Sequence, residues 1–259
     1  MDLRLTAMVE HSKTTSLLQR CSAALQRSSY YLFPGRCILC SALSKRPLDL
    51  CVGCEAELPF NRPACQCCAL PMNSAGSTLI NSVTCGKCIS DPPAFTRCIA
   101  PLRYEFPINK LINGFKHHGQ FSRGTVLAEL LLCELTSQEI LPELILPVPL
   151  HWRRQFTRGF NQAQWLSHYL GRRLAIPVDT RLLSRQKYTP AQQGLPRKQR
   201  LKNLKGAFRL NNNIEGKHIA LVDDVVTTGS TISELSCLLR KAGANHVEIW
   251  CLARTPLEK

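Results

Sequence analysis

Nine consecutive residues near the end of the printed sequence combine two acids with a run of hydroxyl-bearing side chains. They are Asp223, Asp224, Val225, Val226, Thr227, Thr228, Gly229, Ser230 and Thr231. Hydroxyls and backbone N–H groups at the start of a helix bind phosphate, because the helix dipole favours an anion there. Two adjacent carboxylates can accept hydrogen bonds from ribose hydroxyls, directly or beside a Mg²⁺ that also contacts pyrophosphate. The segment therefore predicts a site for a phosphorylated sugar or nucleotide.

The residues on both sides of this segment predict the elements that position it. Residues 219–222 form a short apolar run, which is typical of a buried parallel strand. Ile232, Leu235 and Leu239 recur at helical spacing, and residues 247–252 form a second apolar run. This order places the polar loop at the carboxyl end of a strand, where open α/β sheets bind ligands. The Gly-x-x-x-x-Gly-Lys-Ser/Thr pattern of a nucleotide P-loop is absent from the sequence.

Eight of the 14 cysteines form four pairs in which two residues separate the thiols. The pairs are Cys37 with Cys40, Cys51 with Cys54, Cys65 with Cys68, and Cys85 with Cys88. Two such pairs supply the four thiolates of a tetrahedral zinc site, and four sulfurs leave no position for a substrate. We therefore expect two structural Zn²⁺ ions, with the pairs combined sequentially or interleaved and with Cys67 as an alternative ligand.

A disulfide scaffold, a redox dithiol and an iron–sulfur cluster are the alternatives to zinc. The sequence has no recognisable secretory signal, which argues against disulfides, and a redox dithiol is not expected four times in a row. Four thiolates can also hold a cluster, but zinc is the simplest interpretation. No apolar run approaches the ~18 residues of a membrane span. We therefore expect a cytoplasmic protein without a membrane span.

Positive charge is concentrated in one part of the sequence. The formal net charge is +15, and thirteen Lys or Arg residues between 151 and 206 stand against a single acid, Asp179. Such an excess favours an anionic partner, although it can also be a solvated face. Aromatic side chains among these cations can stack the bases of single-stranded DNA, or they can belong to the core. They are Trp152, Phe156, Phe160 and Trp165.

The two acids, two apolar residues and Thr-Thr-Gly-x-Thr loop at 223–231 resemble the binding signature of type I phosphoribosyltransferases. With the cysteine pairs in front, the chain from about Cys37 onward resembles the ComF family of competence-associated proteins, also known as GntX. The run Pro-Val-Pro-Leu at 147–150 and the arginines after it resemble a second stretch of that family, which implies that a loop after this strand carries Arg153 and Arg154. The resemblance implies an α/β, Rossmann-like fold of phosphoribosyltransferase type I with a mostly parallel sheet and a small N-terminal double zinc-ribbon module.

The resemblance also implies a function in natural competence, DNA uptake or use of external DNA, with phosphoribosyl pyrophosphate or a related ribose 5-phosphate as ligand. In this family, residues matching 223–231 hold the ribose and its 5-phosphate. The resemblance also implies that a set of basic residues contacts pyrophosphate, in part from a mobile loop, or contacts DNA. They are Arg153, Arg154, Arg158, Lys187, Arg197 and Lys198. Hypoxanthine-type enzymes carry an Asp where this chain has Thr227, so transfer to a 6-oxopurine is not expected. Two alternatives stay open: a base phosphoribosyltransferase of nucleotide salvage, and a non-catalytic module that binds single-stranded DNA and DNA-processing proteins.

Three parts are expected along the chain. Residues 1–32 form a weakly ordered or helical lead, residues 33–91 the double zinc ribbon, and residues 95–259 the phosphoribosyltransferase-like domain. Within the last part we expect strands at 98–104 and 144–148, helices at 108–117, at 125–135 and from Asn161, and a mobile loop at 188–208. Residues 115–118 resemble a family position near the sugar pocket, although His117 and His118 by themselves are expected to be solvated.

Overall fold

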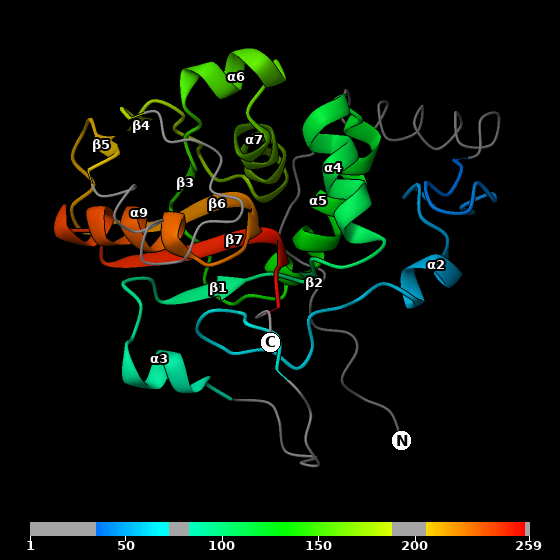
Figure 1. The fold of residues 1–259 in the computed structure, drawn as a ribbon, viewed down its shortest axis with the longest axis horizontal. Helices are drawn as coiled ribbons and strands as arrows, with labels where there is room; N and C mark the ends of the chain where they lie inside the picture. Colours follow the sequence, from blue (N-terminus) through cyan, green and yellow to red (C-terminus); the bar gives the residue numbers. More distant parts are fainter. Residues whose placement is uncertain (1–34, 73–82, 188–205, 257–259) are drawn as a thin grey trace, which may run out of the picture. The chain divides into compact units, whose positions relative to one another are not determined.

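The computed structural model describes residues 35–72, 83–187 and 206–256 (Figure 1). Contacts within the chain divide it into two compact units, Met1–Ala56 and Glu57–Lys259. The expected N-terminal lead and most of the expected mobile loop, including Arg197 and Lys198, lie outside the described residues. In the part of the chain that is described, no helix combines the length and the apolar character needed to cross a membrane.

The first unit is rich in turns around its two cysteine pairs. The N–H of Cys37 donates to the carbonyl of Ala42 at 2.8 Å, which closes the first turn. Helix α2 (Val52–Ala56) carries Glu55, whose carboxylate lies 2.5 Å from the guanidinium of Arg46. The residues of α2 are not buried, so helix packing contributes little to this unit. Its folding is therefore expected to depend on a bound ion.

A five-stranded sheet lies at the centre of the second unit (Figure 1). Its order is β1–β7–β6–β3, and β2 pairs with β7 further along the same side as β1. The strands are β1 (Arg97–Ile99), β2 (Leu102–Arg103), β3 (Leu144–Pro147), β6 (His218–Val226) and β7 (His246–Arg254). All of these pairings are parallel. The carboxyl ends of β3, β6 and β7 therefore lie at one edge of the sheet.

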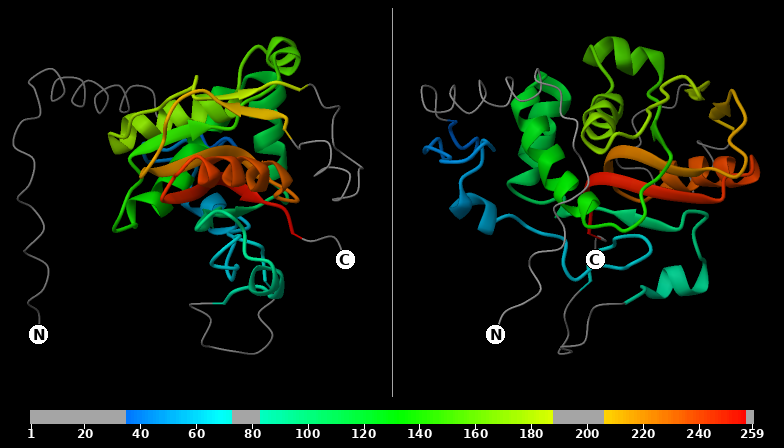
Figure 2. Two further views of the ribbon diagram at one scale, coloured as in Figure 1. Left: turned by 90° about the vertical axis from the view of Figure 1, so that its left-hand side faces the viewer. Right: turned by 180° about the vertical axis from the view of Figure 1, so that it is seen from behind.

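The described helices of the second unit lie before, between and after these strands. They are α3 (Gly86–Ser90), α4 (Ile108–His118), α5 (Phe121–Thr136), α6 (Trp152–Arg158), α7 (Gln162–Leu174) and α9 (Ser230–Lys241). Helices α4 and α5 pack side by side (Figure 2), α7 packs on β6 and β3, and α9 packs on β7. A separate antiparallel pair is formed by β4 (Leu183–Arg185) and β5 (Phe208–Leu210).

The central strands are buried on both faces, as is usual for a parallel sheet between helices. On one face of β6, Ile219 and Leu221 join an apolar cluster that includes Leu235 of α9. Ala220 and Val222 point to the other face and are also fully buried. The polar residues at the end of β6 therefore follow a strand that is held rigidly from both sides.

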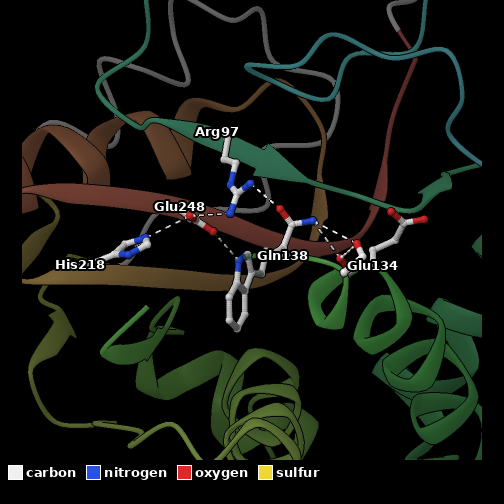
Figure 3. Close-up of polar contacts among 7 residues, drawn as sticks. Arg97, Glu134, Gln138, His218 and Glu248 are labelled. Carbon is white, nitrogen blue, oxygen red and sulfur yellow. Dashed lines mark hydrogen bonds and ion pairs between the residues drawn. The ribbon is translucent and has the colours of Figure 1, made fainter. Parts of the chain in front are cut away.

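Glu248 of β7 is a buried carboxylate that ties three neighbouring strands together (Figure 3). Its Oε1 lies 2.9 Å from the guanidinium of Arg97 on β1 and 3.0 Å from Nε2 of His218 on β6. Its Oε2 accepts a hydrogen bond from Nε1 of Trp250 at 3.1 Å. Arg97 also donates to Oε1 of Gln138, just after α5, at 2.5 Å. These bonds satisfy the buried carboxylate, as a buried charge requires.

The predicted α/β class with a mostly parallel sheet is confirmed. The strands expected at 144–148 and 247–252 correspond to β3 and β7, and the helices expected at 108–117 and 125–135 correspond to α4 and α5. Two local predictions were wrong. Strand β6 continues to Val226 rather than ending at 222, because the apolar Val225 and Val226 extend its pairing with β7. Residues 152–158 form helix α6 where a loop was expected, because His151 caps the helix at its start.

Candidate ligand site and metal centres

Asp223 and Asp224 lie near the carboxyl end of β6. Successive side chains leave a strand on opposite faces, so the two carboxylates start in different directions. The N–H of Asp224 donates to Oδ1 of Asp223 at 2.9 Å, and the N–H of Val225 donates to Oδ1 of Asp224 at 2.7 Å. These bonds hold both carboxylates close to the backbone, immediately before the turn that leads into α9.

This turn has the features of a phosphate-binding loop. Gly229 adopts φ 78° and ψ 3°, a left-handed conformation that suits glycine, and it is the N-cap residue of α9. Among the described residues, no side chain caps α9 at this position. The first N–H groups of a helix have no partner within it, so those of Ser230 and Thr231 can bind an anion. Oγ1 of Thr228 and Oγ of Ser230 lie 3.0 Å apart and add hydroxyls beside them.

The ammonium group of Lys116 faces the acid pair from the last turn of α4. Its Nζ lies 2.7 Å from Oδ2 of Asp224, and the two side chains are 20% and 11% exposed. Burial lowers the pKa of Lys116, but the charge and hydrogen bond of Asp224 together with the charge of Asp223 outweigh burial, so the pKa is raised overall. Nε2 of Gln162 on α7 donates to the carbonyl of Lys116 at 3.1 Å and fixes this end of α4. Lys116 therefore forms a charged pair with Asp224.

The ionisation of Asp223 is altered by its surroundings. Burial raises the pKa of Asp223 to about 7, and the neighbouring charge of Asp224 adds to this rise, while Lys116 opposes it. Arg158, at the end of α6, interacts electrostatically with both carboxylates, and burial lowers its pKa. Near neutral pH the pair therefore takes up and releases a proton at Asp223, while Lys116 and Arg158 supply positive charge.

The predicted basic residues are distributed over α6 and the end of β4. Arg153 is exposed and Arg154 partly buried on α6, and Lys187 is exposed just after β4. Nδ1 of His151 accepts from the N–H of Arg153 at 3.3 Å and so fixes the start of α6. Of these residues, Arg158 interacts electrostatically with Asp223 and Asp224. Among the described residues, Lys187 forms no ion pair with either acid.

Two basic side chains near this place, Arg185 and Arg254, were missed from the sequence, whereas Lys116 lies in the stretch 115–118 that resembles a family position near the sugar pocket. Arg185 lies at the end of β4. Burial and the charge of Arg154 lower its pKa, while the charge of Asp223 acts in the opposite direction. Arg254 is 6% exposed at the end of β7, and its Nη1 donates to the carbonyl of Val226 at 2.9 Å. The position of Lys116 at the end of a predicted helix was a weak signal. No local pattern distinguishes Arg185 or Arg254.

The paired cysteines form two groups of four, as the sequential combination requires. The groups are Cys37, Cys40, Cys51 and Cys54, and Cys65, Cys68, Cys85 and Cys88, and in each the sulfurs lie within 4.8 Å of one another. Zn–S bonds of about 2.3 Å in a tetrahedron place sulfurs about 3.8 Å apart. The Sγ atoms of Cys40 and Cys51 are 3.8 Å apart, and those of Cys68 and Cys85 are 3.7 Å apart. Both groups therefore fit a tetrahedral ion.

Cys67 lies beside the second group without belonging to its four members. Its carbonyl accepts from the N–H of Cys98 on β1 at 2.8 Å. Burial opposes ionisation of Cys65, but backbone N–H groups of Cys68 and Cys85 outweigh it and lower the pKa of Cys65 to about 7. A thiolate favoured in this way is the form that binds zinc.

Fold and site together define a class of protein: a type I phosphoribosyltransferase-fold domain preceded by a double zinc ribbon. Residues 157–258 match the family described as phosphoribosyl transferase domain, and residues 29–89 match the double zinc ribbon domain. Competence protein F of Haemophilus influenzae is 40% identical over 232 residues, which cover 86% of this chain and 98% of that protein. The chain belongs to the ComF family.

Other known proteins are similar to this chain to different extents. The DNA utilization protein YhgH of Escherichia coli K12 is 36% identical over 228 residues, which cover 86% of this chain and 98% of that protein. The crystal structure of a purine phosphoribosyltransferase from Pyrococcus horikoshii aligns with 20% identity and a TM-score of 0.32, covering 51% of this chain and 72% of its own. The ribbon match and the two four-cysteine groups together support structural zinc.

Proposed function

We propose that the protein binds phosphoribosyl pyrophosphate, or a related ribose 5-phosphate ligand, at the carboxyl end of β6. The observation that carries this proposal is that the acid pair lies near the carboxyl end of β6, and that the strand leads through a short loop to the start of α9, where Gly229 provides no side-chain cap. In this proposal the N–H groups and hydroxyls of residues 227–231 hold the 5-phosphate. Asp223 and Asp224 accept hydrogen bonds from the ribose hydroxyls.

The cations around the acid pair are suited to the rest of such a ligand. Arg158 and Lys116 both interact with Asp224, and further basic residues lie on α6 and after β4. We assign the pyrophosphate group to these cations, together with a Mg²⁺ that it would bring with it. The proposed contacts come from Arg153, Arg154, Arg158, Lys187, Arg197 and Lys198.

A transferase reaction at this site would break the bond between the ribose anomeric carbon and pyrophosphate and form a bond to a nucleophilic base. Positive charge develops on the ribose as pyrophosphate leaves, and nearby carboxylates stabilise it. Thr227 stands where hypoxanthine-type enzymes place an acid, so a 6-oxopurine is a poor candidate for the acceptor. We propose ligand binding as the function of the site, and the experiment below determines whether turnover also occurs.

The names of the relatives support a function connected with DNA that the cell takes up or uses. The proteins of H. influenzae and E. coli are named for competence and for DNA utilization. We propose that this protein acts in the cytoplasm in the handling of DNA that the cell takes up or uses as a nutrient, with DNA-processing proteins as partners.

A second candidate function, binding of single-stranded DNA, is favoured by the surface of α6. Trp152 and Phe156, about one turn apart, are 66% and 89% exposed, and they line a surface hollow of about 510 Å³. Arg153 lies over the Trp152 ring at 5.2 Å from its centroid. Phe160 and Trp165, in contrast, pack with Phe115 at 5.6 and 5.1 Å between ring centroids and are partly buried. Bases could stack on the exposed pair while arginines contact phosphates.

A thermal shift experiment on the full chain tests the first proposal. Phosphoribosyl pyrophosphate with Mg²⁺, ribose 5-phosphate and a single-stranded oligonucleotide are compared, since a ligand at a hundred times its Kd stabilises by about 2.7 kcal/mol. We expect both phosphorylated sugars to raise the Tm, Asp224→Asn to abolish the shift, and the exposed Glu215→Gln to preserve it. No shift with either sugar would overturn the proposal. Pyrophosphate release in the presence of free bases separates turnover from binding.

The second candidate is tested by titrating a fluorescent single-stranded oligonucleotide at several salt concentrations. Replacing Trp152 and Phe156 by alanine should weaken binding by about 1–3 kcal/mol for each base that loses its stacking partner. Arg153→Ala should lower the slope of log K against log salt by roughly one. Unchanged affinity in the double alanine variant would exclude α6 as the binding surface.

A further inference from the structure

The second cysteine group is built into the sheet rather than attached to it by a linker. The turn that carries Cys65 and Cys68 is bonded to β1, because the N–H of Cys98 donates to the carbonyl of Cys67 at 2.8 Å. Nδ2 of the buried Asn61 donates to the carbonyls of Ala69 at 2.8 Å and Ala100 at 3.1 Å. The position of this turn is therefore fixed relative to the strands.

Arg254 extends this connection from the cysteine turn to the phosphate loop. Its Nε donates to the carbonyl of Cys68 at 3.2 Å. Its Nη1 donates to the carbonyls of Val226 at 2.9 Å, Thr255 at 3.0 Å and, at the first residue of the loop, Thr227. One guanidinium group thus contacts both a cysteine of the second group and the beginning of residues 227–231.

The chemistry of arginine makes this contact sensitive to geometry. The guanidinium is planar and rigid, so the direction of Nε determines the directions of both Nη groups. Arg254 is 6% exposed, and the hydrogen bonds that the structure gives it all end on carbonyl oxygens. A displacement of the Cys68 carbonyl would therefore leave a buried donor unsatisfied or shift the carbonyl of Thr227, and either change has a cost.

We infer that Arg254 is a positioning residue that couples the metal ion at Cys65, Cys68, Cys85 and Cys88 to ligand affinity at residues 227–231. An ion that holds the cysteine turn holds Arg254, and Arg254 holds the loop in the geometry that binds phosphate. The inference rests on the proposed binding of a ribose 5-phosphate ligand. Coupling between two sites is reciprocal, so the ligand must also strengthen retention of the metal at the second group.

The reciprocal effect can be measured without any enzymatic activity. Zinc release from the full chain to a chromogenic chelator is followed with and without saturating ribose 5-phosphate. Cys40→Ser, which disrupts the first group, assigns the two release phases. The lower end of usual coupling is about fivefold in affinity. Because changes in affinity fall mostly on the dissociation rate, we expect the sugar phosphate to slow release from the second group by about that factor or more. Release from the first group, which lies in the other compact unit, should not change and serves as the internal control.

Variants of Arg254 identify the residue that carries the coupling. Arg254→Met should retain zinc at both groups, bind ribose 5-phosphate more weakly and lose the slowing of release. Arg254→Lys keeps the charge without the planar fork and should lose the coupling as well, which also provides a second variant if the first does not fold. Arg240→Met is the matched control, because Nη1 of Arg240 donates to the Ala244 carbonyl at 2.6 Å at the far end of α9. It should behave like the unaltered protein.

The outcomes separate this inference from the proposed function. Ribose 5-phosphate that binds without slowing release, or that slows both phases equally, would overturn the coupling while leaving the proposed function intact. Equal slowing in Arg254→Met and in the unaltered protein would exclude Arg254 as its carrier. Absence of any binding would remove the proposed function and the coupling together.

Discussion

Nζ of Lys116 and Oδ2 of Asp224 lie 2.7 Å apart, although their positions in the sequence are more than a hundred residues apart. The pair joins the last turn of α4 to the carboxyl end of β6. It places a positive charge at one of the two acids that are proposed to hold the ribose. Binding of a sugar at Asp224 must therefore share the carboxylate with Lys116 or displace it.

Removal of Lys116 should destabilise the protein. Lys116→Met leaves the carboxylate of Asp224 without its cation. We expect the free energy of unfolding to fall by roughly 2 kcal/mol, less than the cost for a fully buried pair, because both groups keep some solvent access. Urea denaturation measures the change. Lys110→Met, at an exposed position of the same helix, should stay within about 0.5 kcal/mol. Equal effects of the two changes would contradict a role for the ion pair.

The ionisation of Asp223 predicts a pH dependence of stability. The pKa of Asp223 is about 7 in the folded protein, and the ordinary value in an unfolded chain is about 3.9. Between these values the folded chain keeps a proton that the unfolded chain has released, so Asp223 contributes less stability as the pH rises towards 7. Asp223→Asn removes this effect.

The comparison should be made between pH 5.5 and 8.5, where the thiolates stay bound to zinc. The stability of Asp223→Asn relative to the unaltered protein should rise with pH, by at most about 1.4 kcal/mol per pH unit, and level off above about pH 7. Glu215→Gln, at an exposed carboxylate, should give a flat difference. A flat difference for Asp223→Asn would contradict the raised pKa.

Two glycines with similar backbone geometry allow a matched test of the phosphate loop. Gly229 has φ +78° and Gly216 has φ +74°, and neither has a crowded site for an added Cβ. Alanine at either position should cost about 1 kcal/mol of stability, because a side chain disfavours the left-handed region. Only Gly229→Ala should weaken binding of ribose 5-phosphate, which calorimetry can measure. An equal loss of affinity in Gly216→Ala would mean that general destabilisation is responsible.

The buried carboxylate of Glu248 should matter more for stability than an exposed one. Glu248→Gln keeps the shape of the side chain but removes the charge that faces Arg97 and His218. We expect a loss of roughly 2–4 kcal/mol in urea denaturation. Glu143→Gln affects a pair with Lys217 at 3.8 Å whose side chains are about half exposed, and should cost less than about 1 kcal/mol. Similar losses would contradict the assigned role of the network.

The sequence predicted those elements and site residues whose signal is local. Apolar runs located β3, β6 and β7, and the spacing of cysteines located both four-sulfur groups. Helix α6 escaped prediction because it has only 7 residues and two apolar side chains, Trp152 and Phe156, which are too few for a periodic pattern. Its cap, His151, stabilises it locally.

Contacts between distant parts of the chain could not be predicted in this way. Lys116 meets Asp224 and Arg254 meets Cys68 because the sheet brings their elements together, and 186 residues separate the second pair along the chain. The type of each residue gives no indication of such a partner. Charge and size were visible in the sequence, whereas the pairing depended on the complete fold.

Strand β7 lies between β1 and β6, so it joins the earliest strand of the sheet to the rest. Arg97 of β1 and its partner Glu248 are 151 residues apart, and this loop must close before β1 is paired. During synthesis, β1 stays unpaired until the ribosome has released the residues of β7. A nonsense mutation before His246 should therefore leave a chain that depends on chaperones for solubility.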